Sequence, residues 1–455
     1  MRYVGILIVL LSIPGLYLWL RSSRRNYSYA YFAIGLLPFV QTAVNLDASL
    51  WNIGGLGYAK GLVVTLLDTL CLAILATSRF KILRLPFTGL FAAYIAATFL
   101  SIFQAPGFFE SFSFTFQLLR AFLVFITVAT VVQQPGALQR IASGLAVGAI
   151  IQGVVAISQR LSGDFQASGT MGHQNLTGMA LHFTTLPLLA MLLAGNKSKL
   201  YLFGVAGGLA AVAAGASRGS IAALAVGLAV LVLCSVFRHA TSRKFGLIGI
   251  LAVLVAAASP VLYQGLAKRF DNVAEVSQVD EERQAFVRAA SAMFSDYPLG
   301  VGANRYTFVG ITHGYSARAG VTWAGTSRTA VVHNLYWLTA AELGWLGLLT
   351  LPPLLLLIII RGFAFAFTQR RDPRGDVVLG FTCAVLVTAW QSFYEWVFVL
   401  SNMNYMFAIA MGVVAGSIVQ RKQQRAVPKR AAQPPGTRTS ARQPALAAAL
   451  SANRR

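Results

Sequence analysis

Residues 219–237 read GSIAALAVGLAVLVLCSVF, nineteen positions without one charged side chain. A transmembrane α-helix needs roughly 20 consecutive apolar residues. In hydrocarbon every backbone N–H and C=O must be hydrogen-bonded within the protein, which a helix achieves by itself. The stretch therefore predicts a membrane-spanning helix. Thirteen such runs occur, near residues 3–20, 29–46, 61–78, 86–103, 114–132, 141–158, 175–194, 199–215, 219–237, 245–263, 333–360, 377–399 and 403–420.

The composition agrees with a chain that lies in a bilayer. Of 455 residues, 56% are hydrophobic and only 11% are charged, whereas soluble domains carry about 25% charge. Water-soluble globular folds are thereby excluded. We predict an all-α polytopic membrane protein with 12–13 transmembrane helices and one large helical loop. Its expected parts are N-terminal transmembrane helices (1–263), a loop domain (264–332), C-terminal transmembrane helices (333–420) and a disordered basic tail (421–455).

The net charge of +23 follows the membrane topology. Cytoplasmic loops are enriched in Lys and Arg, and 25 of the 37 basic residues fall on alternate connections or in the tail, against 11 on the other side. This places the C-terminus in the cytoplasm and leaves the N-terminal orientation open between twelve and thirteen spans. The acid-free tail suits attraction to anionic lipid, and nucleic-acid binding is not expected.

The long loop lies on the side opposite the cytoplasm. Apolar residues recur in it at helical spacing, which predicts an amphipathic helix lying along the membrane surface; they are Val276, Val279, Phe286, Ala290 and Met293. The sequence SDYPLGVG at 295–302 then ends the helix. A loop of this length between spans is usually functional.

Three helix starts on the outer side carry distinctive polar groups. They are residues 172–175, which end in Asn175, residues 217–219 around Arg218, and the pair His333 and Asn334. Helix N-termini bear unpaired N–H groups and the positive end of the helix dipole. Together with an arginine they predict an anion-binding surface suited to phosphate.

Simpler readings stand beside these functional ones. Asn175 and His333 could only cap helices, and Arg218 could be a charge in a tight turn. Arg120 lies inside a predicted span, where it must be paired, hydrated or directed outward. On the loop helix, Arg283 and Arg288 could pair with Glu281 or Glu282. Glu342 lies about 13 Å deeper than His333 on one helix, so it is expected to be a buried structural partner.

No metal or cofactor site is predicted. The three cysteines, Cys71, Cys234 and Cys383, lie far apart inside apolar runs, as small core or lipid-facing residues do. The loop has no carboxylate pair at metal-binding spacing, and the chain has no nucleotide-binding motif.

Several segments in order resemble the O-antigen ligase/polymerase superfamily. The segment HNLYWLTAAELGWLG at 333–347 is similar to its signature, as are YPLGVG at 297–302 and Arg283 upstream with an aromatic, Phe286, three residues later. Ser-Arg-Gly at 217–219 resembles the family's Ser-Arg-Gly turn, and residues 169–175 resemble its element ending in Asn. The similarity runs from about residue 165 to 350.

The resemblance implies a GT-C-like glycosyltransferase of the bacterial inner membrane with a periplasmic active site. The donor would be a glycan on undecaprenyl diphosphate, and the acceptor of the ligase branch would be the lipid A–core oligosaccharide. Other branches polymerise repeat units or glycosylate proteins, and these alternatives stay open.

The chemistry of the residues fits this implication. Arginines bind phosphate oxygens bidentately, so Arg218 and Arg283 are candidates for the diphosphate, with Arg288 and Arg120 in reserve. Histidine titrates near neutral pH, which makes His333 the candidate general base; Asn175, Asn334 and Glu342 would support it. A metal-independent displacement with inversion is the simplest reaction. A transporter or flippase is the alternative from another class, but internal repeats typical of transporters are not visible.

Overall fold

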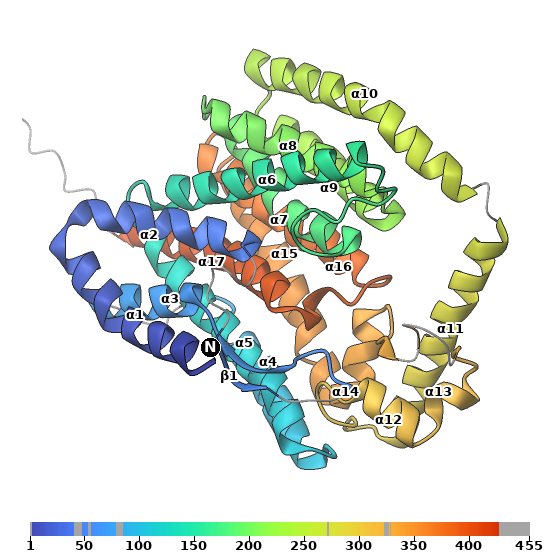
Figure 1. Ribbon diagram of the computed structural model, residues 1–455. Helices are drawn as coiled ribbons and strands as arrows, with labels where there is room; N and C mark the ends of the chain where they lie inside the picture. Colours follow the sequence, from blue (N-terminus) through green and yellow to red (C-terminus); the bar gives the residue numbers. More distant parts are fainter. Residues whose placement is uncertain are drawn as a thin grey trace, which may run out of the picture. The chain divides into compact units, whose positions relative to one another are not determined.

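The computed structural model describes residues 2–40, 48–52, 56–78, 85–270, 273–322, 327 and 329–426. Most of the described chain is α-helical (Figure 1). Its elements are α1 (Arg2–Ser22), α2 (Arg24–Leu36), β1 (Ala48–Asn52), β2 (Gly61–Val64), α3 (Leu66–Thr77), α4 (Thr88–Ser101), α5 (Phe108–Val131), α6 (Ala137–Leu161), α7 (Gln174–Leu193), α8 (Lys199–Gly215), α9 (Arg218–Arg238), α10 (Ser242–Phe270), α11 (Val273–Asp296), α12 (Tyr306–Thr312), α13 (Tyr315–Arg318), α14 (Leu335–Leu348), α15 (Leu351–Thr368), α16 (Pro373–Gln391) and α17 (Ser401–Ala426), with short 3₁₀ turns at Leu37–Phe39, Ile102–Gln104 and Val397–Val399.

The predicted all-α polytopic membrane fold is confirmed. Within the described residues, seven helices are long and apolar enough to cross a membrane: Gly5–Ser22, Phe108–Val131, Ala137–Leu161, Gln174–Leu193, Arg218–Arg238, Leu351–Thr368 and Ser401–Gln424. Three shorter apolar helices accompany them, at Leu66–Thr77, Thr88–Gln104 and Lys199–Gly215. The total of 12–13 spans stays a prediction. The predicted disordered tail lies outside the described residues from 427 onward.

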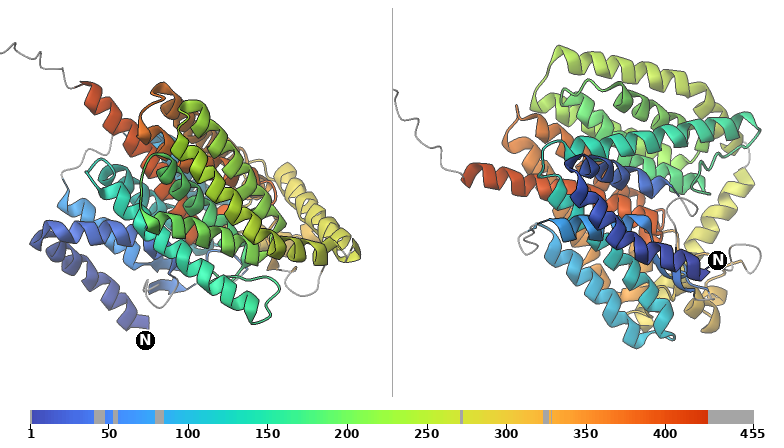
Figure 2. Two further views of the ribbon diagram at one scale, coloured as in Figure 1. Left: turned by 90° about the horizontal axis from the view of Figure 1, so that it is seen from above. Right: turned by 60° about the vertical axis from the view of Figure 1, so that its left-hand side comes forward.

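Helix α7 forms the centre of the helix bundle. It packs against α6, α8, α9 and α16 (Figures 1 and 2), and all its side chains from Leu176 to Leu193 are buried. Small residues allow the close approach: a Cβ on Gly380 of α16 would lie 2.3 Å from the Cβ of Ala190. Such contacts are typical of helices in membranes, where packing and small residues replace the hydrophobic driving force.

One predicted span begins as a β-strand. Gly61–Val64 is β2, which pairs antiparallel with β1 in the register Asn52 to Gly61, and α3 starts only at Leu66. The start is set by a capping box, in which Asp68 accepts a hydrogen bond from the backbone N of Thr65 at 2.8 Å. Because this cap satisfies the first backbone N–H groups, the helix cannot extend back over the whole apolar run.

Another predicted span, 333–360, is two helices. Gly344 within α14 has φ 59° and ψ −147°, which breaks the helix, and α15 starts separately at Leu351. The broken turn pairs with the segment before α12. Val301 N donates to Ala341 O at 2.9 Å, and Trp345 N donates to Pro298 O at 3.0 Å. The YPLGVG segment and the turn of α14 therefore form one backbone-paired unit.

The loop helix α11 has a different environment from the one predicted. Its apolar face was expected to lie on the membrane surface. Instead Phe286, Ala290 and Met293 are buried in a protein core formed with α12, α13 and α14. Figure 1 shows α11 beside these helices, on one side of the bundle. Val276 and Val279 belong to the part of α11 whose side chains lie outside the described residues.

Two basic residues, Arg238 at the end of α9 and Lys244 in the first turn of α10, are buried. Lys244 Nζ lies 3.1 Å from Asp376 Oδ2, and Arg238 forms an ion pair with the same carboxylate. Ser235 Oγ donates to Asp376 Oδ1 at 2.8 Å. Buried charges are costly unless they are paired, so this cluster fixes α9, α10 and α16 against one another.

Candidate active site

Three helix starts meet the end of α16. Leu335 N at the start of α14 donates to Ser392 O at 2.8 Å. Gln391 Nε2 at the end of α16 donates to Ser220 Oγ in the first turn of α9 at 3.3 Å. Near the start of α7, a Cβ on Gly178 would lie 2.4 Å from Ser220 Oγ. The three helix starts that the sequence singles out are therefore neighbours.

Glu395, just after α16, is the residue that these elements share. Asn175 Nδ2 donates to its Oε1 at 2.7 Å, and a nitrogen of Arg283 lies 3.7 Å from the same oxygen. His333 Nδ1 lies 3.4 Å from its other oxygen, Oε2. Only 6% of the Glu395 side chain is exposed, so its carboxylate depends on these partners for polar contacts.

His333 is held at the edge of the protein with one nitrogen directed at Glu395. Its ring lies between Phe286 and Trp396, with ring centroids 6.3 and 6.1 Å away. The side chain is 26% exposed. A carboxylate at Nδ1 favours the tautomer with its proton there, which leaves the lone pair of the neutral ring on Nε2.

His173 lies beside this cluster and starts α7. Its Nδ1 accepts a hydrogen bond from Asn175 N at 3.2 Å, and its ring lies 6.5 Å from that of Trp396. Although His173 is exposed, desolvation lowers its pKa; Glu395 opposes this shift and His333 adds to it. The neutral ring is the form that can accept the hydrogen bond at Nδ1.

The pairing of Arg283 corrects a simpler expectation. A solvated ion pair with Glu281 or Glu282 on the same helix was considered from the sequence. Arg283 pairs instead with Glu395, which lies in a different part of the chain, and its side chain remains 40% exposed. An arginine in this position can contact both the protein carboxylate and a bound anion.

The central role of Glu395 is not evident from the sequence. In the sequence Glu395 is one carboxylate in an apolar region. The available clue is its position inside the aromatic run Phe-Tyr-Glu-Trp at 393–396 after a predicted span. A carboxylate at such a place needs a partner, but the pattern does not say which one.

Residues 203–351 match a family model described as O-antigen ligase. This third of the chain is similar to the O-antigen ligase family. The resemblance to the O-antigen ligase/polymerase superfamily is thereby confirmed. No curated protein matches the chain.

The match to the O-antigen ligase family covers only part of the cluster. It includes Arg218, Arg283 and His333. Asn175 precedes the matched residues and Glu395 follows them. The two residues that complete the cluster thus come from outside the family match and are placed by the tertiary structure.

Arg218, in the Ser-Arg-Gly turn of the O-antigen ligase signature, is the first residue of α9 and is partly exposed. Ser217 caps the helix by accepting from Ser220 N at 3.4 Å. Because Ser220 also contacts Gln391, Arg218 lies two residues from the junction with the segment that carries Glu395. The start of α9 thus lies against the end of α16, and the assignment of Arg218 to the diphosphate stays a prediction.

Arg288 has a separate partner. Its Nε and a terminal nitrogen both donate to Ala319 O, at 3.3 and 2.9 Å. Five helical residues turn the side-chain direction by about 140°, so Arg288 and Arg283 point to different sides of α11. The contacts of Arg288 hold the end of α13 and do not bring it to Glu395.

Asn334 caps α14. Its Oδ1 accepts from the backbone N of Tyr336 and of Trp337 at 3.0 Å, and its Nδ2 donates to Phe393 O at 3.0 Å. The side chain thus holds the start of α14 against the segment that leads to Glu395. It supports His333 by fixing the backbone next to it.

Glu342 lies inside the protein, as expected for a structural partner. Tyr58 OH donates to it at 2.6 Å, and the backbone N of Asn304 and of Tyr306 each donate at 2.9 Å. The carboxylate thereby ties α14 to α12 and to the segment before α3. His333 has no part in this network among the contacts of the described residues.

Arg120 is paired within the helix bundle. Its Nε lies 2.7 Å from Asp68 Oδ2, and it also contacts Tyr405 OH. Both charged side chains are almost completely buried. The interpretation of Arg120 as a reserve ligand for diphosphate therefore loses its support, because a buried ion pair would have to be broken to release the guanidinium.

Two glutamines of α6 hold the segment that leads to Asn175. Gln152 Oε1 accepts from Thr170 N at 2.9 Å, and Gln159 Oε1 accepts from Gly169 N at 2.8 Å. Gly169 has φ 60°, a conformation that favours glycine. The resemblance at residues 169–175 thus corresponds to a fixed loop in front of α7.

Within the described residues, no three metal-ligating side chains lie together as a metal site.

Proposed function

We propose that the protein transfers a glycan from undecaprenyl diphosphate to the lipid A–core oligosaccharide at the periplasmic face of the inner membrane. The similarity of residues 203–351 to the O-antigen ligase family and the apolar helices support a multi-pass membrane protein of this kind. The transfer itself is proposed because Asn175, Arg283 and His333 meet at Glu395.

In this proposal His333 is the general base. Its Nε2 takes the proton from the acceptor hydroxyl, while Glu395 holds Nδ1 and stabilises the imidazolium that forms. A carboxylate in this position orients the ring and favours its charged form. The neighbouring Phe286 and Trp396 limit how the ring can rotate.

The transfer is a single displacement. The acceptor oxygen forms a bond to the anomeric carbon of the donor glycan, and the bond from that carbon to the diphosphate oxygen breaks. The electron pair leaves with the diphosphate, whose negative charge Arg218 and Arg283 neutralise. The hydroxyl proton stays on His333 until solvent removes it. The displacement inverts the anomeric carbon, so a product with the donor's configuration would contradict it.

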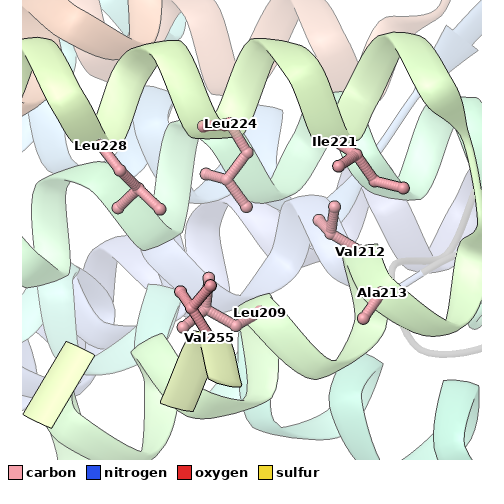
Figure 3. A pocket seen from close by; sticks show the side chains of 8 residues that line it. Leu209, Val212, Ala213, Ile221, Leu224, Leu228 and Val255 are labelled. Atoms are coloured by element: carbon pink, nitrogen blue, oxygen red, sulfur yellow. The ribbon is translucent and has the colours of Figure 1, made fainter. Parts of the chain in front are cut away.

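A lipid carrier suits the surroundings of Arg218. One turn further along α9, Ile221 begins an apolar pocket that continues past Leu224 to Leu228. The opposite wall is formed by α8 and by Val255 of α10, and every side chain drawn in Figure 3 is a hydrocarbon. A donor with its diphosphate at Arg218 could place the isoprenoid chain against such a surface.

Deletion of the protein followed by gel analysis of lipopolysaccharide tests the function. We expect lipopolysaccharide without attached long glycan, together with lipid-linked glycan of normal length. Single repeats still attached to the core would indicate a polymerase. Normal lipopolysaccharide with unglycosylated proteins would indicate a protein O-oligosaccharyltransferase. Lipid-linked glycan retained on the cytoplasmic side would indicate a flippase and contradict the proposed transfer.

A further inference from the structure

A buried junction of three helices lies directly inside the candidate site. Ser220 is its centre: Gln391 Nε2 donates to its Oγ at 3.3 Å, and His182 Nε2 lies 3.1 Å from its carbonyl oxygen. Gly178 leaves room for the hydroxyl, since a Cβ there would lie 2.4 Å from Ser220 Oγ. The junction thus brings together α7, α9 and α16.

Each helix of this junction carries a residue of the site. Arg218 lies two residues before Ser220 on α9, and Asn175 lies three residues before Gly178 on α7. On α16, Gln391 O accepts the backbone N of Glu395 at 3.0 Å. One side chain therefore links the start of α9 to the turn that presents the carboxylate.

The polar groups of the junction are buried and incompletely paired. Gln391 Oε1 and His182 Nδ1 have no hydrogen-bond partner among the described residues, although Gln391 is only 1% exposed and His182 0%. Leaving a buried polar atom unpaired is costly unless water reaches it. A role in packing alone would be filled better by an apolar side chain.

We propose that Gln391 is a positioning residue, which sets the location of Arg218 relative to Glu395 and His333 through its hydrogen bond to Ser220. The proposal rests on the proposed transfer reaction. The diphosphate must be held at a fixed distance from the base while the acceptor hydroxyl attacks. A displacement of about 1 Å in such an arrangement can lower the rate about 100-fold.

The test compares three variants of the full-length protein in detergent. Gln391→Met removes the hydrogen bond with little change in volume. The double variant Ser220→Ala/Gln391→Met removes both partners of the hydrogen bond, so no polar side-chain atom of this pair is left unpaired. The matched control is Thr388→Val, one turn earlier on α16, whose buried hydroxyl is likewise unpaired among the described residues.

We expect kcat for transfer from a polyprenyl-diphosphate glycan to fall at least about tenfold in Gln391→Met. The double variant should regain the wild-type unfolding temperature but keep the low kcat. Affinity for inorganic pyrophosphate, measured by calorimetry, should weaken severalfold in both. Thr388→Val should change neither quantity.

The outcomes separate the two proposals. Wild-type protein without transfer would overturn the proposed function, and pyrophosphate binding would still decide the role of Gln391. Wild-type kcat and wild-type pyrophosphate affinity in the double variant would overturn the positioning role. If kcat recovers together with the unfolding temperature, Gln391 acts only through stability, and the positioning proposal is also wrong.

Discussion

Asn175 Nδ2 donates a hydrogen bond of 2.7 Å to Glu395 Oε1, across 220 positions of sequence. The contact joins the start of α7 to the segment after α16. Because it occupies one carboxylate oxygen, it leaves Oε2 on the side of His333, where Nδ1 lies 3.4 Å away. The proposed base, its carboxylate and the neighbouring arginine thus depend on an amide that the local sequence presents only as a helix start.

Replacing His333 by Ala should abolish transfer while donor binding persists. Removal of a general base typically costs about 10²- to 10⁴-fold in rate. Single-turnover transfer and donor binding are measured on the same preparation. His313→Ala is the control, since His313 is exposed at the end of α12. Near-normal transfer by His333→Ala would eliminate the base assignment.

Glu395→Gln tests the charge of the carboxylate separately from its shape. The amide oxygen can still accept from Asn175, but a neutral group does not stabilise the imidazolium of His333. We expect kcat to fall at least about 100-fold and the KM for the donor to change little. A KM effect without a kcat effect would show that Glu395 serves binding through Arg283 instead.

Arg218→Ala should weaken recognition of the donor diphosphate. Losing a charge-assisted hydrogen bond costs about 1.5–3 kcal/mol, so we expect the KM for the donor to rise about 10- to 100-fold. Arg361→Ala, on the exposed surface of α15, is the control for the loss of a positive charge. Unchanged KM and kcat with a short-glycan donor would remove Arg218 from the site.

Gly344→Ala should destabilise the protein without touching the site. Its φ of 59° is strained for other residues, and a Cβ would lie 2.1 Å from Pro298 O. Strained backbone alone costs about 1–3 kcal/mol, so the unfolding temperature in detergent should drop by several degrees. In Gly89→Ala, where the Cβ meets nothing within 4 Å, it should not drop. An unchanged value for Gly344→Ala would disprove the close approach.

Acid should weaken the start of α7 through His173. Its pKa is lowered in the folded state by desolvation, so the folded protein binds fewer protons than the unfolded chain. Stability is then constant above the ordinary histidine pKa of about 6.5 and decreases as the pH falls below it. His173→Asn keeps a cap that cannot titrate. A wild-type slope of unfolding temperature against pH in this variant would contradict the assignment.

Short-range sequence patterns predict most of the helices of this protein and the polar residues at their starts. The apolar runs predict the membrane helices, because each helix satisfies its own backbone hydrogen bonds. The polar helix starts at Asn175, Arg218 and His333 are recognisable for the same reason, since capping and helix dipoles act within one turn. The end of α11 at Asp296, two residues before Pro298, is likewise a local property.

Contacts between distant residues needed the tertiary structure. The importance of Glu395 is evident only from its contacts with Asn175, Arg283 and His333. The burial of Arg120 is explained by its ion pair with Asp68, 52 residues away. The break at Gly344 is stabilised by the segment at 298–302, whose amides take up the carbonyls released from α14. A buried charge or unpaired carbonyl needs a polar partner, and this requirement can be recognised from the sequence. The residue that acts as the partner is decided by how the helices pack.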